Sequence, residues 1–249
     1  YTFRDRPVER LINSVSSIRC HHNAYDVRFV VVDYGSSQRF MSELNEACRL
    51  ASIAVVRTET QGYPWNCAIA TNIGVRHVKT DAFISIDIDM IFESDIILEV
   101  MNVLIKGKKI HCRPYWLPPS GDRRRAKLGN FAQLGGMMAM KLDDFFEVGG
   151  FNEEINFWGS EDSEFDLRAK KSGIETVWLE KTIKMYHVWH PLSHGFCDLR
   201  PIASIIQDRS MMIRALVPLS ENRSVNRKIG EIITKKNRPI IEWLQFKNE

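Results

Sequence analysis

Three long apolar runs, each ending in polar or turn residues, constrain the fold of this chain more than any other feature. They read VRFVVVDYGSS (27–37), IAVVRTE (53–59) and DAFISIDIDMIF (81–92). Two segments with apolar residues at helical spacing, 39–51 and 66–78, separate them. Unbroken apolar runs are typical of strands buried on both faces, and their alternation with helices predicts a mostly parallel sheet with helices on both sides. The expected fold class is α/β.

The second half of the chain is less regular. Residues 117–131 (LPPSGDRRRAKLGNF) are rich in Pro, Gly and Arg, which predicts a loop. A strand and a short helix are expected over 132–151, and a further helix over 160–173. From about residue 196 the pattern changes to short helices with basic residues. We therefore expect one domain over 1–195 and a helical C-terminal extension over 196–249.

Charge and cysteine usage narrow the classes of partner and compartment. The 34 Lys and Arg nearly cancel the 31 Asp and Glu, so no nucleic-acid partner is expected. The five cysteines lie far apart without a zinc-type spacing, which favours reduced thiols in a cytosol-like compartment. No apolar run approaches the roughly 20 residues that a membrane span needs. A domain cut from a membrane-anchored parent would show the same features.

Carboxylates stand where the apolar runs end. Asp33 ends one run, and Asp87 and Asp89 lie near the end of another. Ligands of open α/β sheets bind at the carboxyl ends of the strands. Two aspartates two positions apart on a strand point the same way and suit a divalent cation that prefers oxygen ligands. Turn or cap residues at strand ends are an equally simple interpretation of a bare Asp-x-Asp.

A histidine pair and a second acidic cluster complete the set of candidates. His187 and His190 are three positions apart and could face one cation, or be structural. Glu161 and Asp162 lie where a helix should begin, so they are either caps that favour the helix dipole or a general base. In the second case Trp158 would offer an aromatic face to a sugar ring.

Together these segments resemble the inverting GT-A glycosyltransferases of families 2 and 7, of the β-1,4-galactosyltransferase and chondroitin-polymerase type. The resemblance is carried, in order along residues 1–190, by YTFRDRP, VVVDYGSS, WNCAIATNIGV, FISIDIDMIF, LGGMMAM and VGGFNEEINFWGSEDSEFDLR. Tyr34 stands where the commoner motif has a second Asp, and Ser160 replaces the second glycine of Trp-Gly-Gly-Glu-Asp. The resemblance implies a nucleotide-sugar half over about 1–110 and an acceptor half over about 111–195.

The resemblance implies a nucleotide site in the first half. Phe3, Arg4 and Arg6 match the aromatic-Arg-x-Arg of the nucleotide edge. Asp33 would contact uracil. Asn72, from the Asn-x-Gly of the helix, would also belong to the nucleotide-binding residues. A UDP-sugar is the implied donor.

The resemblance also implies a metal site. Asp89 would bind the cation directly, and Asp87 would lie by the ribose or by metal-bound water. His187 is the first candidate for a further ligand, with His190 as its rival. The implied metal is Mn²⁺, with Mg²⁺ as the alternative.

The acceptor side follows in the same way. Asp162 would be the base that takes the proton of the attacking hydroxyl, and Glu161 and Trp158 would hold the acceptor. Gly135 and Gly136 would let the backbone approach the sugars. A single displacement at the anomeric carbon would invert its configuration. The expected activity is transfer of a hexose or N-acetylhexosamine to a saccharide, free or lipid-linked, in polysaccharide or glycoconjugate synthesis.

Two other functions and a location complete the expectations. A non-catalytic sugar- or nucleotide-binding module would keep the fold but should have lost part of the acidic and histidine set. A sugar nucleotidyltransferase should show a Gly-rich, basic opening loop, which this sequence lacks. We expect a bacterial enzyme at the cytosolic face of the membrane, in peripheral contact with it, with the Golgi lumen as the alternative.

Overall fold

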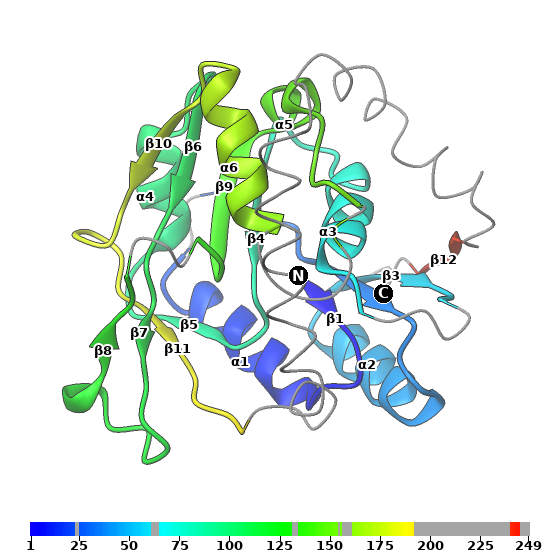
Figure 1. The fold of residues 1–249 in the computed structure, drawn as a ribbon. Helices are drawn as coiled ribbons and strands as arrows, with labels where there is room; N and C mark the ends of the chain where they lie inside the picture. The colour runs from blue at the N-terminus through cyan, green and yellow to red at the C-terminus, as the bar shows by residue number, and fades with distance from the viewer. Residues whose placement is uncertain are drawn as a thin grey trace.

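The computed structural model describes residues 1–22, 25–60, 65–130, 134–153, 155 and 161–191, and the backbone of 240–244 (Figure 1). The helices are α1 (Val8–Arg19), α2 (Gln38–Leu50), α3 (Cys67–Arg76), α4 (Ile96–Val103), α5 (Leu142–Val148) and α6 (Glu161–Lys171), with a 3-10 helix η1 (Arg123–Arg125). The strands are β1 (Thr2–Phe3), β2 (Val30–Tyr34), β3 (Ala54–Thr58), β4 (Ala82–Ile86), β5 (Met90–Phe92), β6 (Lys108–His111), β7 (Tyr115–Trp116), β8 (Lys127–Leu128), β9 (Met137–Lys141), β10 (Glu175–Trp178), β11 (Met185–His187) and β12 (Ile240–Leu244). They form three four-stranded sheets.

The first sheet has the order β1-β2-β3-β12, and its first three strands are parallel. Its β2 and β3 are two of the predicted apolar strands. Strand β12 pairs antiparallel with the free edge of β3. The expected helical extension is therefore wrong for Ile240–Leu244, because the backbone groups of this edge pair with a strand. Residues 192–239 lie outside the described part, so the division at residue 195 stays a prediction.

Helices bury both faces of this sheet. Val31 and Val55 pack in a cluster with α1 and α2, whereas Val32 and Val56 pack in a second cluster with α3. Accordingly, α1 and α2 lie on one side of the sheet and α3 on the other (Figure 1). Successive strand residues thus face two separate cores, which explains the unbroken apolar runs and confirms the α/β class. None of the described helices is long and apolar enough to cross a membrane.

The second sheet, in the order β10-β6-β9-β4, is mixed, because β9 runs antiparallel to both of its neighbours. The strand predicted over 81–92 is divided here. Strand β4 ends at Ile86, and the N–H of Met90 donates to the oxygen of Asp87 at 3.1 Å, which closes a turn before β5. The expectation that Asp87 and Asp89 share a strand is wrong, because both lie in the turn between β4 and β5.

The third sheet has the order β5-β11-β7-β8. Strand β11 is antiparallel to β5 and parallel to β7, and β7 is antiparallel to β8. The segment predicted as a loop over 117–131 therefore contains η1 and β8 and folds back on β7 as a narrow ribbon, at the lower left of Figure 1. Backbone pairing, which the Pro- and Arg-rich composition did not indicate, fixes Lys127 and Leu128 against β7.

A buried ion pair holds α6 against α5. Glu164 and Arg168 lie one helical turn apart, with side chains only 4% and 7% exposed. Arg168 Nη2 donates to Glu164 Oε2 at 2.6 Å, and its Nη1 donates to the backbone oxygen of Val148, at the end of α5, at 2.9 Å. Both charges are thus paired and hydrogen-bonded, which is the condition for burying them without a large cost.

We expect Arg168→Met to lower the free energy of unfolding by about 3–5 kcal/mol, because it leaves the Glu164 carboxylate buried without its cation. Urea unfolding measures the change. The matched control is Arg39→Met, which breaks the exposed i,i+4 pair with Glu43 and should cost less than about 1 kcal/mol. Equal effects of the two substitutions would contradict the structural role of the buried pair.

Candidate active site

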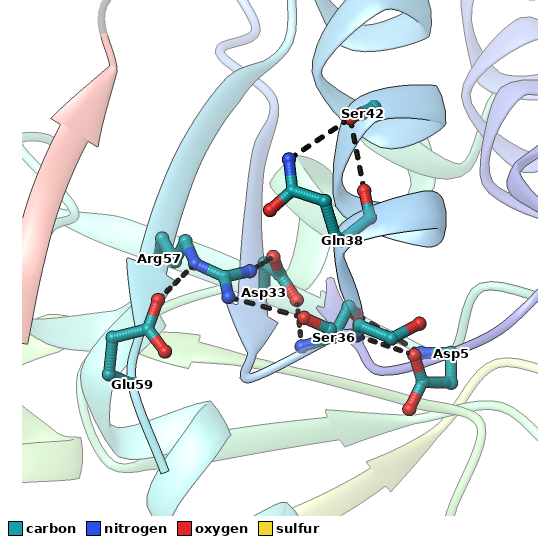
Figure 2. Close-up of polar contacts among 8 residues, drawn as sticks. Asp5, Asp33, Ser36, Gln38, Ser42, Arg57 and Glu59 are labelled. Atoms are coloured by element: carbon teal, nitrogen blue, oxygen red, sulfur yellow. Dashed lines mark hydrogen bonds and ion pairs between the residues drawn. The ribbon is translucent and has the colours of Figure 1, made fainter. Parts of the chain in front are cut away.

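The end of β2 carries a buried ionic network (Figure 2). Asp33 is fully buried; it accepts the N–H of Ser36 at 2.9 Å and forms an ion pair with Arg57. Arg57 also donates to the oxygen of Ser36 at 3.2 Å and to Glu59 at 2.5 Å. The N–H of Asp5 donates to the Ser36 hydroxyl at 3.0 Å. The network joins the ends of β1, β2 and β3, and the contact of Asp33 with a base stays a prediction.

The residues predicted at the nucleotide edge lie in different environments. Phe3 is 1% exposed and packs in the core with α1, so its side chain does not form an edge. Arg4 lies over the ring of Tyr34, with its guanidinium carbon 6.0 Å from the ring centroid. Arg6 is half-buried, and this burial lowers its pKa. Of the aromatic-Arg-x-Arg motif, the two arginines remain as candidates for contact with phosphate or base.

Helix α3 fixes the segment that precedes the acidic cluster. Asn66 caps the helix by accepting the N–H of Ile69 at 2.9 Å, and its amide donates to the oxygen of Ile155 at 3.3 Å. Asn72 is buried and exchanges two hydrogen bonds of 2.9 Å with the backbone of Phe151. The structure therefore differs from the prediction for Asn72: its amide positions this segment, because the backbone of Phe151 already occupies both of its polar atoms.

The two acidic clusters of the sequence meet at the start of α6. A Cβ atom on Gly135 would lie 3.2 Å from Asp162 Oδ2, and Gly136 accepts the N–H of Asp87 at 3.0 Å. Burial, and then the charges of Glu161 and Asp87, raise the pKa of Asp162 well above its usual value. Burial and the charges of Asp89 and Glu161 raise the pKa of Asp87 to about 7. A side chain at position 135 would therefore crowd the Asp162 carboxylate.

Lys109 lies beside this cluster, although no sequence motif indicated a role for it. Its side chain is buried, and its ammonium forms an ion pair with Asp166, one helical turn beyond Asp162. The hydroxyl of Thr176 donates to the same Asp166 oxygen at 3.2 Å. The charge of Lys109 opposes the rise in the pKa of Asp162. A lysine within an otherwise buried strand was the signal that could have identified it.

Asp89, His187 and His190 form a second group on the other side of the turn. His190 Nε2 lies 3.0 Å from Asp89 Oδ2, and His187 Nε2 lies 3.7 Å from Asp89 Oδ1. One candidate ligand atom from each residue lies within 4.8 Å of the other two. The N–H of Val188 donates to the oxygen of Asp89 at 2.9 Å, which fixes β11 beside the turn.

The electrostatics of this group suit a cation. Burial raises the pKa of Asp89, but the hydrogen bond from His190 and the charge of His187 lower it further, so the net shift is downward. Burial lowers the pKa of His187, which favours the neutral imidazole that binds metals, whereas the hydrogen bond to Asp89 raises the pKa of His190, so a cation bound there would displace a proton. One carboxylate and two imidazoles fit a divalent transition-metal ion. Asp87 is not one of the three residues whose ligand atoms come together, although the charge of Asp89 is the largest of those that raise its pKa.

Two tryptophans, Trp116 and Trp158, bear on the candidate site in different ways. Trp116 lies opposite His187 in the pairing of β7 with β11, and the ring centroids are 4.2 Å apart. No motif of the sequence indicated Trp116; the aromatic pair before the Pro-rich segment was the available signal. Trp158, predicted to hold the acceptor, lies outside the described residues.

Two family models match the chain. The model for glycosyl transferase family 2 matches residues 4–153, and the model described as the N-terminal domain of galactosyltransferase matches residues 123–191. A curated relative from Caenorhabditis elegans, a probable N-acetylgalactosaminyltransferase 9, is 37% identical over 76 residues, which is 28% of this chain and 13% of the relative. The chain thus spans a small part of that relative.

Solved structures show the same fold at low sequence identity. The structure of GalNAc-T7 with UDP, GalNAc and Mn²⁺ matches 96% of this chain and 57% of its own length, with a TM-score of 0.62 and 14% identity. The mannosyltransferase PcManGT from Pyrobaculum calidifontis, with GDP-Man and Mn²⁺, matches 94% of this chain and 73% of its own, with a TM-score of 0.56 and 14% identity. These matches support the expected GT-A fold.

We expect His190→Ala to weaken Mn²⁺ binding at least roughly tenfold in the presence of UDP, because it removes one of three ligands, and even outer contacts to a metal site contribute about 10–100-fold. The electron paramagnetic resonance signal of free Mn²⁺ measures the binding. His21→Ala, an exposed histidine outside the cluster, is the matched control. Wild-type affinity in His190→Ala would exclude His190 as a ligand and leave His187.

Proposed function

This chain belongs to glycosyl transferase family 2, and we propose that it moves a hexose or N-acetylhexosamine from a UDP-sugar to a saccharide hydroxyl with inversion. The observation that carries the proposal is one turn, Asp87 to Asp89, which joins the carboxylate cluster at Asp162 to the group that suits a metal. A general base and a site for the leaving diphosphate are the two parts that such a transfer needs.

The leaving group would be held at Asp89, His187 and His190. A divalent cation bound by these three side chains would supply positive charge against the negative charge that develops on the diphosphate. Mn²⁺ in the matched GalNAc-T7 and mannosyltransferase structures supports this choice of ion. The donor is proposed as a UDP-sugar because GalNAc-T7 carries UDP; the GDP-Man of the mannosyltransferase makes a GDP-sugar the alternative.

The nucleophile would be activated at Asp162. In a single displacement, the acceptor oxygen forms a bond to the anomeric carbon while the bond from that carbon to the diphosphate oxygen breaks. The hydroxyl proton passes to the Asp162 carboxylate, and UDP leaves as the anion. The raised pKa of Asp162 suits this role, because a base accepts a proton best when its pKa approaches the working pH. The charge of Lys109 lowers this pKa and so favours the ionised carboxylate.

The acceptor would be a saccharide, free or lipid-linked, and the location the cytosolic face of a membrane. Among the described residues Cys20, Cys48, Cys67 and Cys112 are free thiols, in keeping with a reducing compartment. A non-catalytic module is disfavoured by the retention of both acidic groups, whose mutual repulsion and burial would be costly without a catalytic use.

The reaction itself provides a direct test. We expect the full chain with Mn²⁺ and an α-linked UDP-hexose or UDP-N-acetylhexosamine to release UDP and form a β-glycoside, as proton nuclear magnetic resonance of the anomeric signal shows. Asp162→Asn should lower the rate by roughly 10²–10⁴, the contribution typical of a general base, without loss of UDP binding. An α-linked product would refute inversion, and release of pyrophosphate would indicate nucleotidyl transfer.

The pH dependence tests the base assignment separately. The transfer rate should fall as the pH drops through the raised pKa of Asp162, because the protonated carboxyl cannot accept a proton. Glu161→Gln removes a neighbouring negative charge, so this pKa should fall and the acidic limb of kcat/KM should move to lower pH. The exposed Glu147→Gln is the matched control and should leave the limb in place. An unmoved limb in Glu161→Gln would contradict the assignment.

A further inference from the structure

The third sheet places three side chains in one row beside the candidate metal group. His187 of β11 lies opposite Trp116 of β7, and Trp116 lies opposite Lys127 of β8. Residues directly opposite each other on paired strands project from the same face of the sheet. His187, Trp116 and Lys127 therefore share one face, and the row leads from the metal group out along the ribbon.

Trp116 is the aromatic member of this row. Its ring lies against that of His187 at 4.2 Å, with a tilt of 33°, and the residue is still 39% exposed. An exposed indole combines a large apolar face with a polar edge, and such side chains are favoured where one part of a ligand is apolar and another is wet. The face of a sugar ring, lined by C–H groups, matches this surface. A ring stacked there would lie next to His187.

Lys127 is the cationic member of the row. It is exposed and forms no ion pair within the part of the chain that the structure describes. Two of the three arginines of the same ribbon are neutralised, since Arg123 pairs with Glu93 and Arg124 pairs with Asp122. Strand spacing places the Lys127 backbone two strands, or about 10 Å, from that of His187. A ligand that extends one sugar ring beyond the metal group would reach its ammonium group.

We propose that Trp116 and Lys127 form a subsite for an anionic saccharide, with the sugar ring on the indole and the negative group on the Lys127 ammonium. The inference rests on the proposed function, in which this saccharide is the acceptor. The negative group is a carboxylate of a uronic acid or a sulfate ester of a neutral sugar; both present oxygens that accept charge-assisted hydrogen bonds. The subsite would thus select acceptors by charge.

The test compares three oligosaccharides of equal length, measured by isothermal titration calorimetry on the full chain with and without UDP and Mn²⁺. One contains uronic acid, one is its carboxyl-reduced neutral form, and one is that neutral form with a sulfate ester. The wild type should bind one of the anionic forms more tightly than the neutral form. Lys127→Met should lower that affinity about tenfold, and Lys127→Arg should retain it, because charge-assisted hydrogen bonds are the strong ones.

Control variants distinguish binding by the row of His187, Trp116 and Lys127 from non-specific attraction by the basic ribbon. Arg125→Met removes an exposed cation of the same ribbon that lies outside the row, and should change the affinity less than about twofold. Trp116→Ala should weaken binding of all three ligands, with Trp116→Phe retaining part of it. Equal losses in Lys127→Met and Arg125→Met would overturn the subsite, as would equal wild-type affinities for the anionic and neutral forms.

UDP binding, measured with Mn²⁺ in every variant, distinguishes this inference from the proposed function. If Lys127→Met weakens UDP binding and leaves saccharide binding intact, Lys127 contacts the donor and the subsite is refuted. If UDP does not bind the wild type but the anionic saccharide binds through Lys127, the subsite stands and the proposed donor is refuted. The source of the negative group follows from which anionic form loses affinity in Lys127→Met.

Discussion

The turn between β4 and β5 is the constraint on which the candidate active site depends. Its backbone is held on both sides, since the N–H of Asp87 donates to Gly136 and that of Val188 donates to the oxygen of Asp89. From this turn Asp87 interacts with the carboxylates of α6, and Asp89 interacts with His187 and His190. A straight strand would have put both into one group.

The site concentrates negative charge in a buried place, and the surrounding structure makes this tolerable. Carboxylates that cannot all ionise together share protons, which is seen in the raised pKa values of Asp87 and Asp162. Lys109 adds one buried cation beside them, and Arg57 does the same for Asp33. Each cation is itself paired, so neither is left as an uncompensated charge. The cluster of Asp87, Glu161 and Asp162 therefore keeps an excess of negative charge, and the raised pKa values of Asp87 and Asp162 follow from it.

Backbone pairing connects the site to the surface where an acceptor could lie. The pairing of β11 with both β5 and β7 places His187, a member of the metal group, directly beside the ribbon. Because the register is fixed by hydrogen bonds, a shift of one residue in β7 or β8 would turn Trp116 or Lys127 to the other face. Many residues of the ribbon are basic, but the register of its strands decides which of them can contact a ligand.

The sequence by itself determined the α/β class, β2, β3 and the helices α2, α3 and α6, because hydrophobic periodicity is a local property of the chain. It also determined the residue types of the candidate site, since Asp-x-Asp, the histidine pair and Glu161-Asp162 are visible as patterns. Only the tertiary structure decided that Phe3 and Asn72 are buried structural residues, that Lys109 faces the acidic cluster, and that Trp116 lies against His187. These features depend on contacts between residues distant along the chain, whose register and burial no local pattern records.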